Sequence, residues 1–332
     1  MPETMLTGNS RRSPRTTLAV SGLVFAALCV FPLAAGEYQS GLLARYLVFG
    51  LFAMSFDLLW GYAGIMNFGH AAFFGLGAYS VGLVLKHFPF VGASLLAAIS
   101  SAVVPLAFAL IFGYFLFYGR VAGVYFAIVS MALSLMMQTL AIALDFTGGL
   151  NGLRGFPPLT LGIPGTFALP ITGDLAPYYL TVVVCALLLL LSLKIVNSSF
   201  GRTIEAIRDN PDRTESLGYD IAGIQLTIFT ISCTMAGIAG ALYVPIGHIS
   251  PEILGLLFST NALVWVSIGG RGTLVGGFVG ALVVSYLQYF LGAWLQNLWY
   301  IIIGVFFILV VLFRGGGIMG FLRNRTREGV GR

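Results

Sequence analysis

Long apolar stretches separated by short polar segments run along most of this chain of 332 residues. A helix that spans a membrane needs about 20 mainly apolar residues. After a first stretch at 18–35, such stretches cover approximately residues 42–61, 68–86, 92–117, 122–144, 177–196, 224–246, 256–270, 273–291 and 295–313. The pattern predicts an all-α, polytopic integral membrane protein with about ten transmembrane helices, or about eight if the shortest stretches do not span.

The first stretch, residues 18–35, allows two interpretations. It follows Arg11, Arg12 and Arg15, and a basic segment before an apolar one is also typical of a cleaved signal peptide. The stretch is long for the apolar core of a signal peptide, and further spans follow it directly. We therefore expect a retained first helix.

Composition supports a membrane protein and excludes several other classes. Hydrophobic residues make up 58% of the chain and charged residues only 9%, whereas a soluble protein carries about 25% charged residues. A soluble enzyme, a nucleic-acid-binding protein and a disordered protein are therefore poor interpretations. The three cysteines, Cys29, Cys185 and Cys233, stand singly in apolar runs, so we expect neither a disulfide framework nor a metal site.

The basic residues predict the orientation of the chain. Cytoplasmic segments of membrane proteins collect Arg and Lys. If both termini are cytoplasmic, only Arg45, Lys86 and Arg154 lie outside, which leaves 14 of the 17 basic residues on the cytoplasmic side. The opposite orientation would reverse this division, so we expect cytoplasmic termini.

This topology divides the chain into segments. It predicts an N-terminal cytoplasmic tail at 1–16, a transmembrane domain at 17–314 and a basic cytoplasmic tail at 315–332. Within the transmembrane domain it predicts a cytoplasmic loop at 197–222 and an extracytoplasmic loop at 145–176. The outer loop is rich in Gly, Pro and Thr, which favours turns over a helix.

The chain lacks the motifs of an energy-coupling or catalytic site. Its two lysines, Lys86 and Lys194, do not stand in the glycine-rich pattern that binds nucleotide phosphates, and HExxH, CxxC and GxSxG are absent. Inside the predicted spans the one acid away from a helix end is Asp57, within a turn of the cytoplasmic side, which disfavours an ion-coupled carrier. We expect no catalytic, metal or cofactor site, and a pore that is passive or powered from outside.

The segment GYAGIMNFGHAAFFGLGAY, residues 61–79, holds too many glycines for an uninterrupted helix. A break near Asn67 would leave a helix N-terminus facing a polar solute, with Gly69 and His70 beside it. Close helix packing through small residues explains the same glycines. The two interpretations are compatible, and both stay open.

The segment 202–220 carries eight of the chain's 29 charges. Its acidic and basic residues are spaced three and four apart, which suits ion pairs on a short surface helix. Pro211 limits this helix, and Gly218 suits its C-terminal end. An amphipathic helix on the cytoplasmic face is what docking to a soluble motor domain requires, but a solvated loop has the same composition.

Two further segments are explained by local structure. The glycine-rich residues 267–284 predict a tight turn between two helices, followed by a face for close packing. On the outer side, Ser250 as N-cap and Pro251 at the first helical position predict a helix start. This start accounts for His248 and Glu252, and a gating or substrate contact of these two side chains is the alternative.

Six blocks in this order resemble a known family: GYAGIMNFGHAAFFGLGAY, GRVAGVYFAIVSMAL, TGGLNGL, FGRTIEAIRDNPDRTESLGYD, MAGIAGALYV and IGGRGTLVGG. Together they resemble the inner-membrane permease of branched-chain amino acid ABC importers, a family that also contains urea-importer permeases. The resemblance runs over about residues 45–322.

The resemblance implies a permease subunit in the bacterial inner membrane that forms half of a translocation pathway. Its implied partners are a second, related permease in a heterodimer, two cytoplasmic ATPases that hold ATP and Mg²⁺, and an extracytoplasmic binding protein. It also implies coupling to the ATPases through residues of the 202–220 segment: Glu205, Arg208, Asp209, Arg213, Glu215 and Gly218.

The sequence departs from many ABC importers, because Glu205 and Ala206 are not followed by the compact EAA-x-x-x-G spacing. Branched-chain amino acids are the expected substrates, with urea or short amides as the alternative. An ion-coupled secondary transporter is the alternative from a different class.

Overall fold

The computed structural model describes residues 36–88, 92–163, 167–170 and 175–295, together with the isolated residues 28, 31, 32, 173, 304 and 305. The tails predicted at 1–16 and 315–332 lie outside the described residues. Apart from the isolated positions, so do the stretch predicted at 18–35 and nearly all of that at 295–313.

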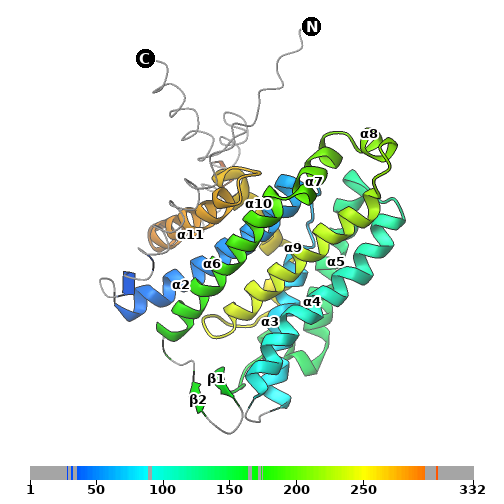
Figure 1. Ribbon diagram of the computed structural model, residues 1–332. Coiled ribbons are helices and arrows are strands. Elements are labelled where there is room, and N and C mark those ends of the chain that lie inside the picture. Colours follow the sequence, from blue (N-terminus) through cyan, green and yellow to red (C-terminus); the bar gives the residue numbers. More distant parts are fainter. Residues whose placement is uncertain are drawn as a thin grey trace, which may run out of the picture.

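Long helices form the body of the molecule and run back and forth through it (Figure 1). In chain order they are α2 (Glu37–Asp57), α3 (His70–His87), α4 (Ala93–Tyr118), α5 (Gly123–Ala143), α6 (Leu175–Asn197), α9 (Ile221–Tyr243), α10 (Leu256–Gly269) and α11 (Val275–Leu295). Two shorter helices, α7 (Ser199–Asp209) and α8 (Pro211–Ser216), lie between α6 and α9.

Six helices of the described part are long and apolar enough to cross a membrane: α2 with the turn after it, α4, α5, α6, α9 and α11. The 18-residue α3 and the 14-residue α10 pack among them. The prediction of an all-α, polytopic membrane protein is therefore confirmed.

Helix α3 packs on α4 and α9. Glycines let these backbones touch. A Cβ on Gly240 of α9 would overlap the carbonyl oxygen of Phe74, and one on Gly77 of α3 would overlap that of Gly237. Gly237 in turn has no room for a Cβ beside the ring of Pro105 in α4. Close packing thus explains much of the glycine content of these helices.

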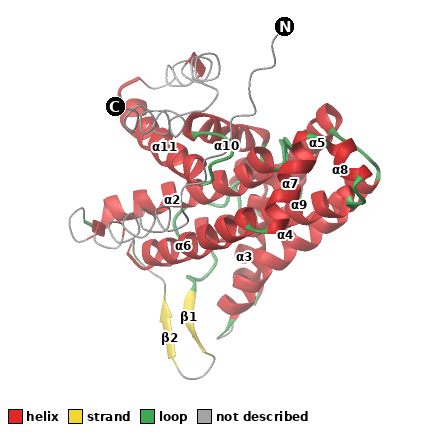
Figure 2. Ribbon diagram, turned by 45° about the horizontal axis from the view of Figure 1, so that its top comes forward, coloured by secondary structure: helices red, strands yellow, loops and turns green. Residues whose placement is uncertain are grey.

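The loop predicted at 145–176 contains more structure than expected. It begins with the 3-10 turns η2 (Asp145–Thr147) and η3 (Gly149–Asn151). A hairpin follows, in which β1 (Thr160–Ile163) pairs antiparallel with β2 (Phe167–Pro170). The hairpin lies at the end of the molecule opposite α7 and α8 (Figures 1 and 2), as the predicted topology requires of an outer and a cytoplasmic loop.

Candidate functional site

The break predicted near Asn67 is present. After α2 the chain widens into a π-turn, η1 (Leu58–Tyr62), and residues 64–67 are not helical before α3 begins at His70. Single π-turns inside helices are frequent at functional sites. Gly64 has φ +73°, a left-handed conformation that suits glycine, and it turns the chain back toward α3.

The polar side chains at this break are buried and bonded to one another. Asn67 and His70 are both fully buried. The Oδ1 of Asn67 accepts from the backbone N–H of Gly69 at 2.9 Å, and its Nδ2 lies 3.4 Å from His70 Nδ1. His70 Nε2 lies 2.9 Å from the hydroxyl of Ser55, which donates to the carbonyl of Phe52. Because the Ser55 hydroxyl donates to Phe52, it accepts from the N–H group at His70 Nε2. His70 Nδ1 then accepts from the amide of Asn67, and the ring is neutral.

The N-terminus of α3 is also saturated by internal partners. The hydroxyl of Ser130 in α5 accepts from Phe68 N–H at 3.1 Å, and that of Ser259 in α10 accepts from Ala71 N–H at 2.9 Å. A Cβ on Gly69 would overlap the carbonyl oxygen of Ser130. The packing interpretation accounts for this geometry in the described state, and the pathway role of Asn67, Gly69 and His70 stays a prediction.

The segment predicted to meet the ATPases forms two helices. Asn210 ends α7, and its Oδ1 caps α8 by accepting from Arg213 N–H at 2.9 Å, while Pro211 occupies the first position of α8. Ser198 caps α7 and Asp220 caps α9 in the same way. Gly218 follows α8 with φ +88°, as its predicted place at a helix end requires. Side-chain caps of this kind are worth about 1 kcal/mol each.

The ion pairs suggested by sequence spacing do not form among the described residues. Arg208 pairs with its neighbour Asp209 at 3.0 Å, not with Glu205. Arg213 makes no ion pair with a described residue. Glu215 pairs with Arg120 of the α4–α5 turn at 3.3 Å. The expected pairs along one helix are therefore absent from the described segment, and the Glu215–Arg120 pair connects two distant segments instead. Of the predicted coupling residues, Glu205 is half-buried and the others are exposed.

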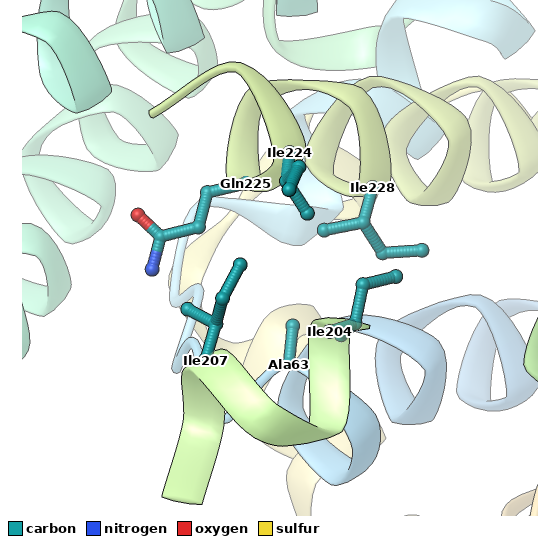
Figure 3. Close-up of a pocket in the computed structure, with 6 residues that line it drawn as sticks. All are labelled: Ala63, Ile204, Ile207, Ile224, Gln225 and Ile228. Carbon is teal, nitrogen blue, oxygen red and sulfur yellow. The ribbon is translucent and has the colours of Figure 1, made fainter. Parts of the chain in front are cut away.

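One face of α7 is apolar and anchors the helix to the bundle. Ile204 and Ile207 are each 4% exposed. Figure 3 shows them facing Ile224 and Ile228 of α9 across a narrow apolar crevice, with Ala63 of the break beside them. The opposite face of α7 and nearly all of α8 remain polar and exposed.

The most extensive polar contact at this end of the molecule was not predicted from the sequence. The fully buried carboxylate of Asp57, at the end of α2, binds the turn between α10 and α11. Its Oδ1 accepts from Gly272 N–H at 2.8 Å, and its Oδ2 accepts from Thr273 and Leu274 N–H at 3.1 and 2.9 Å. An acid in an apolar span and a glycine-rich turn were the available signals, but 215 residues separate them.

Two arginines bind adjacent carbonyls of the π-turn. Arg208 Nη1 donates to the carbonyl of Gly61 at 2.9 Å. Arg271, in the α10–α11 turn, donates through Nη2 to the carbonyl of Trp60 at 3.0 Å and lies 4.5 Å from the centre of the Trp60 ring. Burial lowers the pKa of Arg271, and the positive charge of Arg208 lowers it further. The π-turn is thus held by α7 on one side and by the α10–α11 turn on the other.

Comparison with known proteins places this architecture in a family. The family model described as branched-chain amino acid transport system / permease component matches residues 38–311. The chain belongs to this family of ABC importer permeases. The predicted resemblance is therefore confirmed, and the chain is a transport subunit with a multi-pass fold.

Individual relatives cover most of the permease. The LivM high-affinity branched-chain amino acid transport system permease of Escherichia coli (strain K12) is 27% identical, over 93% of this chain and 76% of the relative. The LivM permease of Salmonella typhimurium (strain LT2) is 30% identical, over 79% and 66%. The BraD permease of Pseudomonas aeruginosa is 26% identical, over 82% and 91%. No solved structure matches the chain.

The other two segments singled out in the sequence of the permease are structural. Residues 270–274 form the predicted tight turn, and a Cβ on Gly280 of α11 would overlap a backbone oxygen of α10. On the outer side, Pro251 opens a 3-10 turn, η4 (Pro251–Leu254), although the Ser250 side chain makes no capping bond. His248 Nε2 lies 2.9 Å from the carbonyl oxygen of Asn151, which ties this segment to the outer loop.

Proposed function

We propose that this permease forms half of the pore of an ATP-driven importer of branched-chain amino acids. The second half comes from a related permease, ATP and Mg²⁺ are held by two cytoplasmic ATPase subunits, and an extracytoplasmic binding protein delivers the substrate. Both termini and the α7–α8 segment face the cytoplasm, and the β1–β2 hairpin faces the outside.

The exposed surface of α7 and α8 is the observation that supports docking of the ATPase subunits at this end of the permease. It presents the charged side chains of Asp209, Asp212 and Arg213, and beside them Leu217 is 72% exposed. A polar surface with few exposed apolar side chains suits a soluble protein partner better than it suits lipid. Because Ile204 and Ile207 anchor the same segment, force applied to this surface reaches the transmembrane bundle.

The ion-coupled alternative has less support. Ion-coupled carriers commonly keep an ionisable side chain at membrane depth as part of the ion site, although backbone carbonyls can also bind Na⁺. Asp57, the acid at membrane depth, already accepts three backbone hydrogen bonds. Its carboxylate holds a turn in place, which accounts for its burial without an ion.

Charge reversal tests the docking surface. We expect Asp209→Arg with Arg213→Glu to reduce co-purification of the ATPase subunits with the permease at least about tenfold, since a change of 1.4 kcal/mol in binding free energy is tenfold in affinity. The matched control is Asp145→Arg, an exposed acid on the opposite end of the molecule, which should leave co-purification unchanged. Equal recovery of ATPase with the double variant would contradict the assignment of this surface.

The substrate is best identified through the binding protein encoded with this importer. We expect saturable binding of leucine, isoleucine or valine in isothermal titration, and no saturation by urea or acetamide. Saturation by urea alone would replace the amino acid assignment with the urea alternative and leave the permease assignment intact.

A further inference from the structure

A hydrogen bond of Arg208 joins the α7–α8 surface to the break between α2 and α3. The side chain of Arg208 in α7 is 34% exposed. Its guanidinium donates to the carbonyl of Gly61, 147 residues earlier in the chain. The aliphatic part of the side chain lies over Gly64, where a Cβ would come within 2.7 Å of Arg208 Cγ. The path of this side chain therefore requires the glycine at position 64.

The acceptors of this contact are carbonyls that the π-turn exposes. The last carbonyls of a helix have no partner within the helix. Here the carbonyl of Leu59 accepts from the N–H groups of both Ala63 and Ile65. The next two carbonyls, those of Trp60 and Gly61, accept from Arg271 and Arg208. Cations suit the negative end of a helix, so the two arginines complete this end of α2.

The two arginines differ in what they are attached to. Arg271 belongs to the α10–α11 turn, which the three bonds to Asp57 fix to α2. Arg208 belongs to α7, whose Ile204 and Ile207 line an apolar crevice with Ala63, the residue directly after the π-turn. Hydrophobic contacts have no preferred direction, whereas a charge-assisted hydrogen bond does. Arg208 is therefore the directional connection between α7 and the turn.

The other end of the connection is the predicted pathway segment. The π-turn is followed directly by residues 63–69, and Asn67 and His70 are joined to α2 through Ser55. Gly61 is only six residues before Asn67, so a displacement of the Gly61 carbonyl would also move the backbone that leads to Asn67. We propose that Arg208 is a positioning residue that transmits movement of α7 to the π-turn and through it to the α2–α3 break. This inference rests on the proposed docking of the ATPases at α7 and α8.

The test uses the whole importer, with both permeases and both ATPases, reconstituted in proteoliposomes with its binding protein. The quantity measured is the ratio of radiolabelled leucine imported to ATP hydrolysed, with radiolabelled urea in a parallel arm. This ratio does not change when a variant only lowers the amount of assembled complex. We expect Arg208→Met to lower the ratio at least about tenfold, because ATP hydrolysis continues while the break no longer follows α7.

Two further variants sharpen the result. Arg208→Lys keeps one charged donor and should restore part of the ratio. Lys194→Met removes an exposed cation at the end of α6, outside the α7–α8 surface, that makes no side-chain hydrogen bond among the described residues, and it should leave the ratio at the wild-type value. A wild-type ratio in Arg208→Met would overturn the inference.

A second readout does not depend on the substrate. A spin label at Ile65, in a variant without the native cysteines, should change its spectrum when ATP is added, and Arg208→Met should abolish this change. A label that responds to ATP equally in both proteins would also overturn the inference. If the wild-type chain recruits no ATPase, the proposed function itself fails. If it recruits ATPase and couples normally without Arg208, only the role of Arg208 fails.

Discussion

Removing the carboxylate of Asp57 should release the turn between α10 and α11. In Asp57→Ala, the half-buried N–H groups of Gly272 and Thr273 and the buried N–H group of Leu274 lose their acceptor. The variant tests whether this contact, which joins helices far apart in sequence, holds the cytoplasmic end of the bundle together.

The expected magnitude follows from the number and kind of the lost bonds. A hydrogen bond to a charged group contributes about 1.5–3 kcal/mol. The energies of three bonds to one carboxylate do not add fully. We therefore expect Asp57→Ala to lower the free energy of opening this turn by at least about 4 kcal/mol. Since 1.4 kcal/mol is a factor of ten, amide exchange in the turn should accelerate about 1,000-fold.

Hydrogen exchange followed by mass spectrometry measures this directly in the purified permease, on a peptide that covers residues 270–276. Asp57→Asn keeps one acceptor oxygen and should show an intermediate rate. Asp145→Ala removes an exposed carboxylate of the outer loop and should leave the rate of the peptide unchanged. Acceleration below about tenfold in Asp57→Ala would refute the reasoning, because a single lost bond would then account for it.

Three other variants test the packing and the caps. Gly240→Ala should abolish most folded protein in detergent size-exclusion chromatography, whereas Gly292→Ala, with open space around its Cα, should not. Asn210→Ala should lower the stability of α8 by about 1 kcal/mol, seen as faster amide exchange at 211–216, and Asn210→Ser should retain it. Ser259→Ala should destabilise the fold by about 1–3 kcal/mol in thermal unfolding, because Ala71 N–H loses its acceptor. Ser267→Ala, whose hydroxyl bonds only within its own helix, should change little.

The helices of the described bundle were predictable because a membrane span is specified by local composition. The break before His70 was predictable for the same reason, since glycines disfavour a helix wherever they gather. Pro211 indicated a limit to the charged helix, and the structure shows that Asn210 and Pro211 divide it into α7 and α8.

Contacts between distant segments were not predictable from one sequence. Spacing along a helix suggested partners for Arg208 and Arg213, but Arg208 instead bonds Gly61 and Asp209. Asp57 looked like an isolated acid because its partners are backbone N–H groups, which leave no mark on the sequence. The β1–β2 hairpin was missed because the loop composition indicates turns and does not specify strand pairing.

The glycine contacts of α3, α4 and α9 also limit how the permease can change shape. Where backbone lies directly on backbone, as at Gly240 and Phe74, no side chain can change rotamer to absorb a displacement. These three helices therefore behave as one rigid body. In a transport cycle we expect these three helices to move together, with a change in the backbone of residues 63–69 as the way for α3 to move relative to α2.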